Sequence, residues 1–175
     1  MSSQRVQNAL DFATQKHAGQ KRIGGADYIT HPLAVCQIVE QQGFGEDYQI
    51  VALFHDLLED TNATEQEILQ LGNQEILQAV KLLTKVKGYN MAQYIEAIKQ
   101  NELARTVKAA DRLHNLQCAL VTDAEFKRKY ILETVDWYMD FSPEIPKALK
   151  VLAQSLEKPI AELPFLYKPI ESWKE

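Results

Sequence analysis

Apolar residues recur at spacings of three and four over most of the chain, and this periodicity constrains the fold more than any other feature of the sequence. It is typical of helices that bury one face. No stretch bounded by turn residues alternates apolar and polar side chains as a half-buried strand does, and only 7 Gly and 6 Pro occur in 175 residues. The sequence therefore predicts an all-α fold of about eight to ten helices.

Polar cap residues indicate where several of these helices begin. The signals are N-cap residues at Asn90 and Asn101 and the spacing of a capping box at 64–67 and at 122–125. Together with the apolar periodicity they predict helices at residues 3–17, 32–43, 47–62, 64–72, 73–85, 90–99, 101–120, 122–139 and 143–157.

The chain length suits one domain. We expect this domain to cover residues 1–158 and to be followed by a C-terminal tail, residues 159–175. The tail contains three prolines and several large side chains, among them Phe165, Leu166 and Trp173. It is expected either to pack on the domain through these side chains or to be partly disordered.

Composition excludes several classes of protein. Apolar residues make up 46% and charged residues 25%, as in ordinary globular proteins. A net charge of -5 disfavours general binding to nucleic acid. No apolar run is long enough for a membrane span and no signal-peptide core is present, so a cytoplasmic location is expected. The two cysteines, Cys36 and Cys118, form no CxxC motif and are expected to be buried thiols without a disulfide.

A cluster of titratable residues interrupts the most apolar segment. His55 and Asp56 lie within an apolar run, and Glu59 and Asp60 follow it. Burying an unpaired carboxylate is costly, and a bound cation would offset that cost. On a helix, His55 is a neighbour of Glu59 and Asp56 is a neighbour of Asp60. The group therefore indicates a metal site, although a surface pair or a hydrogen-bonded structural histidine would explain His55-Asp56 alone.

Asp111 is a second carboxylate in apolar surroundings, between Val107 and Leu113. It supplies a further candidate metal ligand from a distant part of the chain. The alternative is an internal salt bridge with Lys108 or Arg112, each within one helical turn.

Two histidines and two aspartates, His31, His55, Asp56 and Asp111, make a mixed nitrogen and oxygen ligand set. Such a set suits Mn²⁺ or Fe²⁺ better than a thiolate zinc site does. A cation with open positions could bind water and a phosphate oxygen, and it would stabilise negative charge on phosphorus. The other histidines, His17 and His114, are expected to be structural.

A basic loop contains Lys21 and Arg22, followed by Gly24 and Gly25. Glycine lets the backbone approach a ligand closely, and an arginine can stack on a base or bind phosphate. The loop is therefore a candidate ligand contact, with a solvated surface turn as the alternative.

Four segments in this order carry a family resemblance. They are GQKR at 19–22, YITHP at 28–32, HDLLEDT at 55–61 and KAADRLHN at 108–115. They resemble the H…HD…D signature of the HD-domain phosphohydrolases. Within that superfamily they look like the hydrolase domain of RelA/SpoT-type alarmone enzymes, above all its stand-alone form, the small alarmone hydrolases. The similarity spans roughly residues 6–139.

The resemblance implies an HD-domain helical bundle that holds one Mn²⁺. It implies removal of the 3′-pyrophosphate from (p)ppGpp, giving GDP or GTP and pyrophosphate. By position it implies that Glu59 and Asp60 are the catalytic pair, which positions and deprotonates the attacking water. It also implies metal ligation by His31, His55, Asp56 and Asp111, and nucleotide contacts from Lys21, Arg22, Lys108 and Asn115.

Two residues depart from the family pattern near the expected nucleotide site. Ile23 stands where the family usually has a basic residue, and Cys118 stands where Thr or Ser is frequent. An adenosine alarmone (ppApp), a nucleoside 5′-phosphate or an NADPH-like phosphate therefore remain alternative substrates. A non-enzymatic nucleotide-binding module is a further alternative. The expected partner is a small nucleotide rather than nucleic acid or a membrane, and the sequence leaves a homo-oligomer open.

Overall fold

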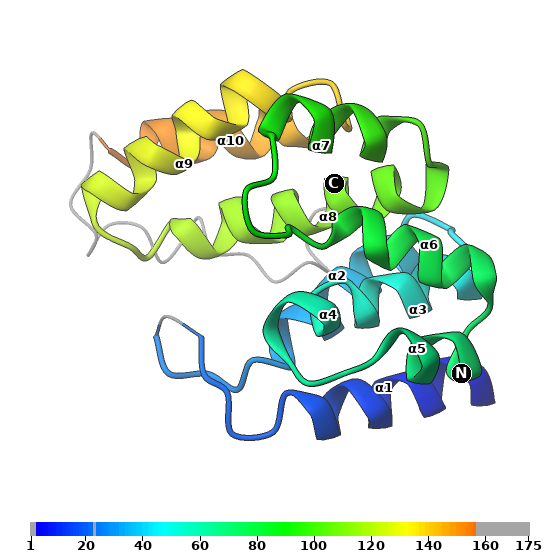
Figure 1. The fold of residues 1–175 in the computed structure, drawn as a ribbon. Coiled ribbons are helices and arrows are strands. Elements are labelled where there is room, and N and C mark those ends of the chain that lie inside the picture. The colour runs from blue at the N-terminus through cyan, green and yellow to red at the C-terminus, as the bar shows by residue number, and fades with distance from the viewer. Residues whose placement is uncertain (1–2, 23, 157–175) are drawn as a thin grey trace. The chain divides into compact units, whose positions relative to one another are not determined.

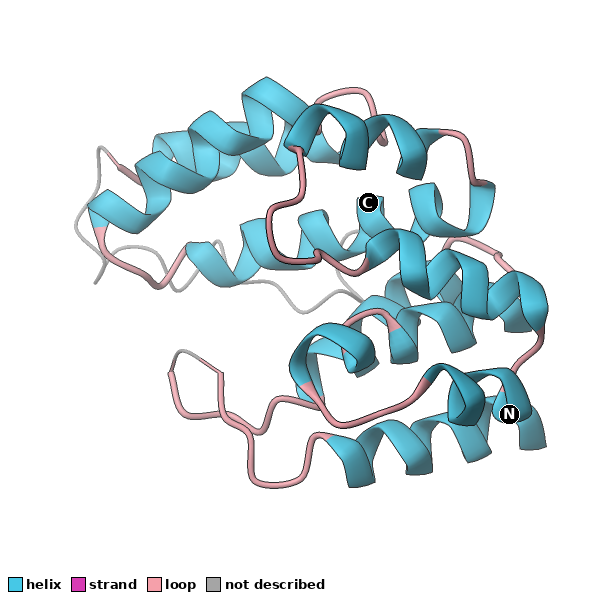
Figure 2. Ribbon diagram, in the orientation of Figure 1, coloured by secondary structure: helices cyan, strands magenta, loops and turns pink. Residues whose placement is uncertain are grey.

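The computed structural model describes residues 3–22 and 24–156. Within these residues the secondary structure is helical, with a single isolated bridge between Lys21 and Asp27 in place of any sheet (Figures 1 and 2), so the all-α prediction is confirmed. The described helices are α1 (Gln4–Lys16), α2 (Thr30–Gln41), α3 (Glu46–Phe54), α4 (Leu57–Asp60), α5 (Glu65–Leu71), α6 (Gln74–Leu83), α7 (Met91–Lys99), α8 (Glu102–Ala119), α9 (Ala124–Trp137) and α10 (Glu144–Gln154).

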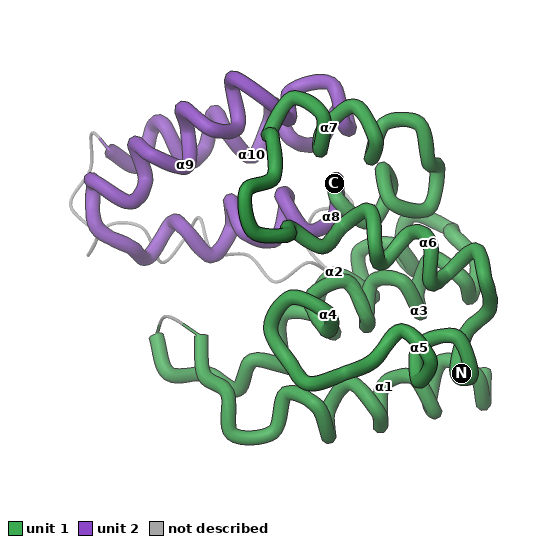
Figure 3. Tube along the Cα trace, in the orientation of Figure 1, with its two compact units in different colours: residues 1–108 green, residues 109–175 purple. Residues whose placement is uncertain are grey.

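The chain divides into two compact units, residues 1–108 and residues 109–175, with the division inside α8 (Figure 3). The expected boundary between domain and tail, and the tail residues Phe165, Leu166 and Trp173, lie outside the described residues.

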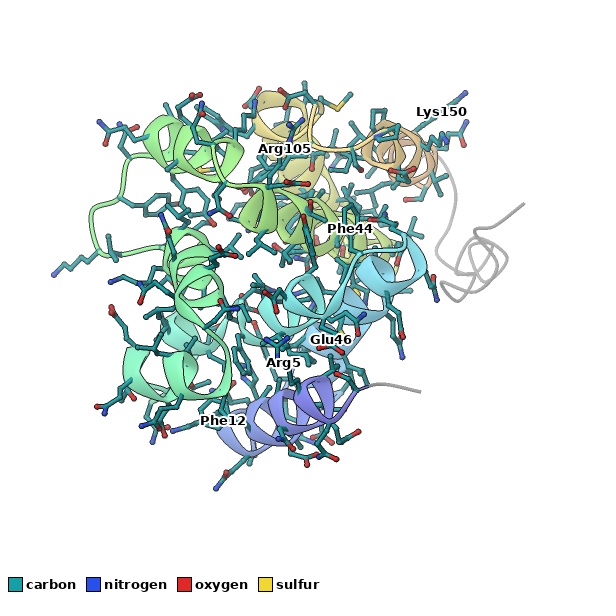
Figure 4. All side chains as sticks on the ribbon, turned by 90° about the vertical axis from the view of Figure 1, so that its right-hand side faces the viewer. Arg5, Phe12, Phe44, Glu46, Arg105 and Lys150 are labelled. Atoms are coloured by element: carbon teal, nitrogen blue, oxygen red, sulfur yellow. The ribbon has the colours of Figure 1, made fainter. Side chains whose placement is uncertain are left out.

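The core of the first unit is built around α3, which packs against α1, α2 and α6. Its residues 50–54 are all fully buried, which explains why this segment is apolar on every face. The ring of Phe12 on α1 meets Phe54 edge to face, with centroids 5.8 Å apart. At the other end of α1, Arg5 donates hydrogen bonds to Glu46 and Asp47 in the first turn of α3 (Figure 4). Both ends of α3 are therefore tied to α1.

The second unit contains a buried arginine between aromatic rings. The guanidinium carbon of Arg112 lies 4.8 Å from the ring centroid of Tyr130 and 3.9 Å from that of Tyr138. Its Nη2 donates to Glu133 Oε1 at 2.7 Å. Arg112 on α8 thereby holds α9, and α9 packs against α10.

Several predicted helix starts are confirmed by their caps. The side chains of Asn90 and Asn101 accept hydrogen bonds from the backbone N–H groups three residues ahead. Thr64 and Glu67 form a full capping box, in which each side chain bonds to the backbone of the other residue.

The prediction of one continuous helix over residues 47–62 is wrong. The helix breaks at His55 and Asp56, so that α3 ends at Phe54 and α4 begins at Leu57. The His55 ring supplies a physical reason, because its Nδ1 lies 2.6 Å from the carbonyl oxygen of Ala52. In a continuous helix that oxygen accepts from the N–H of residue 56, so the imidazole competes with the helical hydrogen bond.

The predicted capping box at Thr122 and Glu125 is also wrong. The N-cap of α9 is Asp123, whose Oδ1 accepts from the N–H of Phe126 at 2.8 Å. Thr122 instead donates to the carbonyl oxygen of Ala119 at the end of α8. Both residue types can cap a helix, so the local sequence did not distinguish Thr122 from Asp123.

This assignment predicts unequal effects at two neighbouring positions. We expect Asp123→Ala to lower the free energy of unfolding by about 1 kcal/mol, because the first turn of α9 loses its side-chain acceptor. Thr122→Ala should change it by less than about 0.5 kcal/mol. Urea denaturation followed by circular dichroism measures both. Equal losses, or a larger loss at Thr122, would contradict the assigned cap.

The two cysteines differ in environment. Both are free thiols, but only Cys36 is fully buried, whereas Cys118 is partly exposed, contrary to the expectation of two buried thiols. Burial, with a smaller contribution from the charge of Glu40, raises the pKa of the Cys36 thiol to about 12. Cys36 is therefore an inert core residue at neutral pH. As for membranes, every described helix is too short or too polar to cross one.

Candidate metal and catalytic site

Two histidines and an aspartate meet inside the first unit. His31 lies in the first turn of α2, and His55 and Asp56 lie in the break between α3 and α4. The Nε2 atoms of the two histidines are 3.3 Å apart. Oδ2 of Asp56 lies 3.1 Å from Nε2 of His55 and 3.7 Å from Nε2 of His31. Since the histidines are 2% and 3% exposed, three potential ligand atoms converge at a buried point.

The hydrogen bonding of His55 defines which nitrogen faces this point. A carbonyl oxygen can only accept, so the contact with Ala52 assigns the proton of neutral His55 to Nδ1. Its Nε2 then presents a lone pair toward His31 and Asp56. Acceptor atoms at such short distances need a proton or a cation between them.

The separations suit a single divalent cation. Bonds of about 2.0–2.2 Å to nitrogen and oxygen hold neighbouring ligand atoms about 3–3.5 Å apart. The three distances among His31, His55 and Asp56 lie in or close to that range. Two of these three residues, His55 and Asp56, form the break between α3 and α4.

Tyr28 links this ligand cluster to the acidic pair, a role that the sequence did not reveal. Its hydroxyl lies 2.8 Å from Oδ2 of Asp56 and 3.0 Å from Oδ2 of Asp60. Burial, and then the charges of these two carboxylates, raise the pKa of the Tyr28 hydroxyl far above its usual value. Tyr28 is therefore a neutral donor whose single proton is shared between the two carboxylates. The available signal was its position three residues before His31 in the YITHP motif.

Behind Tyr28 lies a histidine that the sequence predicted to be structural. The ring of His17 is 2% exposed and stacks on Tyr28, with centroids 4.7 Å apart and an interplanar angle of 26°. Its Nδ1 lies 2.7 Å from Oε1 of Gln20, and Nε2 of Gln20 donates to the carbonyl oxygen of Asp60 at 2.7 Å. His17 and Gln20 therefore contact both Tyr28 and the backbone of the acidic pair, in line with a structural role for His17.

Glu59 and Asp60 are exposed to solvent at the end of α4. Oε2 of Glu59 accepts from the backbone N–H of Lys85 at 2.9 Å, which holds that carboxylate in place. Asp60 also lines a hollow of about 530 Å³ on the surface of the unit. α4 ends where the backbone of Thr61 becomes extended, and the Thr61 hydroxyl donates to the carbonyl oxygen of Leu57 at 2.7 Å. The acidic pair thus combines access to water with a fixed position.

Asp111 belongs to the second unit, where it is 6% exposed on α8. Nδ2 of Asn115 donates to its Oδ1 at 2.6 Å, so a residue predicted to contact nucleotide orients the carboxylate. Arg112, which the sequence offered as a salt-bridge partner for Asp111, forms an ion pair with Glu133. His114, also on α8, lies beside Cys118, with its Nε2 3.5 Å from Sγ.

The basic loop forms a tight turn in which Gly24 and Gly25 have φ of +98° and +89°. Nζ of Lys21 bonds to Asp27, and both side chains are exposed. The guanidinium carbon of Arg22 lies 5.9 Å from the ring centroid of Tyr28, next to the site. Ile23 lies outside the described residues.

The last predicted nucleotide contact, Lys108, lies on α8 at the end of the first unit. Its Nζ is 5.8 Å from the ring centroid of Tyr94, which is a cation–π distance.

Comparison with known proteins gives relatives that match nearly all of this chain. GTP pyrophosphokinase rsh of Brucella ovis is 34% identical over 180 residues, covering 97% of this chain and 23% of that protein. Guanosine-3′,5′-bis(diphosphate) 3′-pyrophosphohydrolase of Aquifex aeolicus is 29% identical over 181 residues, covering 99% of this chain and 25% of that protein. The chain thus spans about a quarter of the length of these curated relatives.

Structural comparison and a family model agree on the fold. A solved structure titled as a metazoan ortholog of SpoT that hydrolyzes ppGpp has a TM-score of 0.72 with 23% identity, covering 88% of this chain and 96% of that chain. The model of the HD domain matches residues 9–142, which is more than half of the chain. Because this match includes the segments that bring His31, His55 and Asp56 together, the chain belongs to the HD-domain family.

Proposed function

We propose that this chain is a divalent-metal-dependent phosphohydrolase that removes the 3′-pyrophosphate of (p)ppGpp. The observation that carries the proposal is the convergence of His31, His55 and Asp56, joined through Tyr28 to Asp60. A buried ligand cluster next to an exposed carboxylate suits metal-assisted hydrolysis, because it can hold a cation and accept a proton from water.

The proposed metal ligands are His31, His55, Asp56 and Asp111. Support comes from their donor atoms, since mixed imidazole and carboxylate ligands suit Mn²⁺, with Fe²⁺ as an alternative. Burial adds support, because His31, His55 and Asp111 are all buried and each offers a ligand atom. When bound, a divalent cation lowers the pKa of water and neutralises charge on a phosphate group.

The acidic pair would handle the proton. In the proposed reaction water attacks the phosphorus attached to the ribose 3′ oxygen, a phosphorus–oxygen bond forms and the bond to the 3′ oxygen breaks. Asp60 or Glu59 accepts a proton of water and later releases it to solvent, and the ribose oxygen takes up a proton from solvent and leaves as the 3′ hydroxyl. The products are pyrophosphate and GDP or GTP.

The choice of nucleotide rests on the relatives and on the residues around the site. The Aquifex aeolicus relative is named as a 3′-pyrophosphohydrolase of guanosine-3′,5′-bis(diphosphate). Arg22 lies beside Tyr28, where it could stack on a base, and Lys21 precedes it on the same exposed loop. Lys108 and Asn115 complete the proposed nucleotide contacts. The adjacent basic residues Lys21 and Arg22 are compatible with a chain of net charge -5.

Incubation of the purified protein with Mn²⁺ and ppGpp tests the proposal. We expect equal amounts of GDP and pyrophosphate to form, measured by ion-exchange chromatography, and activity to disappear on treatment with EDTA and return with Mn²⁺. Metal content measured on the same sample makes the result decisive. Protein that is loaded with Mn²⁺ and releases no pyrophosphate would overturn the assigned activity.

Cys118 gives a reason to test other nucleotides in parallel. It is partly exposed and lies beside His114. The family that the chain resembles often has Thr or Ser at this position. A hydroxyl that could bind a guanine or phosphate group is therefore replaced by a thiol, which is a weak donor. A panel of ppGpp, ppApp, nucleoside 5′-phosphates and NADPH, ranked by kcat/KM, separates a guanosine alarmone hydrolase from the alternatives. A preference for ppApp would support the proposed reaction, the removal of a 3′-pyrophosphate, but would show that the substrate is an adenosine alarmone.

A further inference from the structure

We propose that Tyr28 is a positioning residue that couples the carboxylate of Asp56, a proposed metal ligand, to the acidic residue Asp60. This inference rests on the proposed function for the role of Asp60, but its effect on the metal site can be measured separately. The observation behind it is that one hydroxyl group lies within hydrogen-bonding distance of Oδ2 of both carboxylates.

The oxygen that Tyr28 contacts on Asp56 is the same one that faces the histidines. Oδ2 of Asp56 lies 2.8 Å from the Tyr28 hydroxyl and 3.1 Å from Nε2 of His55. A hydrogen bond to this oxygen selects the rotamer that points it into the ligand cluster. Outer partners of this kind orient metal ligands, and their loss typically weakens metal binding or activity by about 10–100-fold.

The same hydroxyl also acts on Asp60. Asp60 is exposed at the end of a four-residue helix, where its side chain has little packing to hold it. The contact with Tyr28 at 3.0 Å and the bond from Gln20 to its carbonyl oxygen fix the side chain and the backbone respectively. Tyr28 therefore restricts the Asp60 side chain to fewer orientations, which favours the one that contacts the attacking water.

Tyr28 can do this because its own ring is held on two sides. One face stacks on the buried His17 ring, and the ring meets His31 edge to face with centroids 6.2 Å apart and an angle of 84°. His17 is in turn the C-cap of α1 and bonds to Gln20. Because the ring is held in this way, the hydroxyl of Tyr28 has a fixed position. A hydroxyl on a flexible aliphatic side chain would not have one.

The test is Tyr28→Phe, which keeps the ring and its stacking and removes only the hydroxyl. Tyr89→Phe is the matched control, because Tyr89 is 41% exposed and its ring lies against Tyr94 and Lys85 rather than the metal ligands. Three quantities are measured for wild type and both variants: the Kd of Mn²⁺ without nucleotide by calorimetry, kcat and KM for ppGpp at saturating Mn²⁺, and Tm without metal.

For Tyr28→Phe we expect the Kd of Mn²⁺ to rise by about 10–100-fold and kcat to fall by a similar factor at saturating metal. KM should change by less than about threefold, because the lost contact orients protein groups rather than substrate. Tyr89→Phe should match wild type in all three. A Tyr28→Phe variant with unchanged Mn²⁺ affinity and unchanged kcat would overturn the proposal. A fall in Tm large enough to unfold the variant under the assay conditions would also overturn it, because unfolding would then explain the weaker Mn²⁺ binding and the lower kcat.

Failure of the two proposals can be told apart. If wild type binds Mn²⁺ but hydrolyses no alarmone, the proposed function is wrong. The comparison of Mn²⁺ affinities still decides whether Tyr28 orients Asp56. If wild type hydrolyses ppGpp and Tyr28→Phe equals it in both affinity and kcat, the function stands and the coupling role is wrong.

Discussion

Replacing Asp60 by asparagine is expected to lower kcat for ppGpp by about 10²–10⁴-fold, the usual contribution of a general base. Asparagine has nearly the same shape and keeps an oxygen that can accept the Tyr28 hydrogen bond, but it cannot take a proton from water. The Kd of Mn²⁺ should stay within about threefold of wild type, because Asp60 is not among the proposed ligands. Steady-state kinetics and calorimetry on the same sample measure the two quantities.

Asp136→Asn is the control for this change, since Asp136 is an exposed aspartate on α9. It should leave kcat unchanged within about twofold. The double variant of Glu59→Gln with Asp60→Asn should abolish turnover. The amide oxygen introduced by Glu59→Gln could still accept from the N–H of Lys85, but neither amide side chain could act as a base. Wild-type kcat in the double variant would exclude the acidic pair from the reaction.

Replacing His55 by alanine is expected to abolish both metal binding and activity. The substitution removes Nε2, which lies within 3.3 Å of the proposed ligand atoms of His31 and Asp56, so the Kd of Mn²⁺ should rise by more than the roughly 100-fold typical of an outer partner. Wild type in Mn²⁺ at 100 times its Kd should gain about 2.7 kcal/mol of stability, which appears as a rise in Tm. The variant should show no such rise.

His55 is buried, and its Nδ1 contacts the Ala52 carbonyl oxygen, so the alanine variant also leaves a cavity and an unpaired oxygen. Asp56→Asn provides a second test that preserves the shape of the half-buried side chain while removing its charge. His114→Ala, at a partly buried histidine on α8, is the control and should retain the Mn²⁺-dependent rise in Tm. An equal rise in His55→Ala and Asp56→Asn would show that the metal binds elsewhere.

Much of the candidate site could be predicted because it contains charged residues within apolar segments of the sequence. Asp56 and Asp111 stand in apolar segments, and that is a signal that sequence alone carries. Tyr28 carried no comparable signal, because a tyrosine beside a helix start is ordinary. Its role depends on the hydroxyl meeting side chains 28 and 32 residues away, which only folding brings within 3 Å.

The amino-acid sequence by itself determined the helical class and most helix starts, because apolar periodicity and cap chemistry act over a few neighbouring residues. Tertiary structure decided the break at His55 and Asp56, the choice of Asp123 over Thr122 as a cap, and the orientation of Asp56 by Tyr28. The first two depend on side chains that bond to a nearby backbone carbonyl oxygen in place of a helical or capping bond, and local sequence patterns do not show which bond forms. The third depends on residues 28 apart in sequence, which only the folded chain brings together.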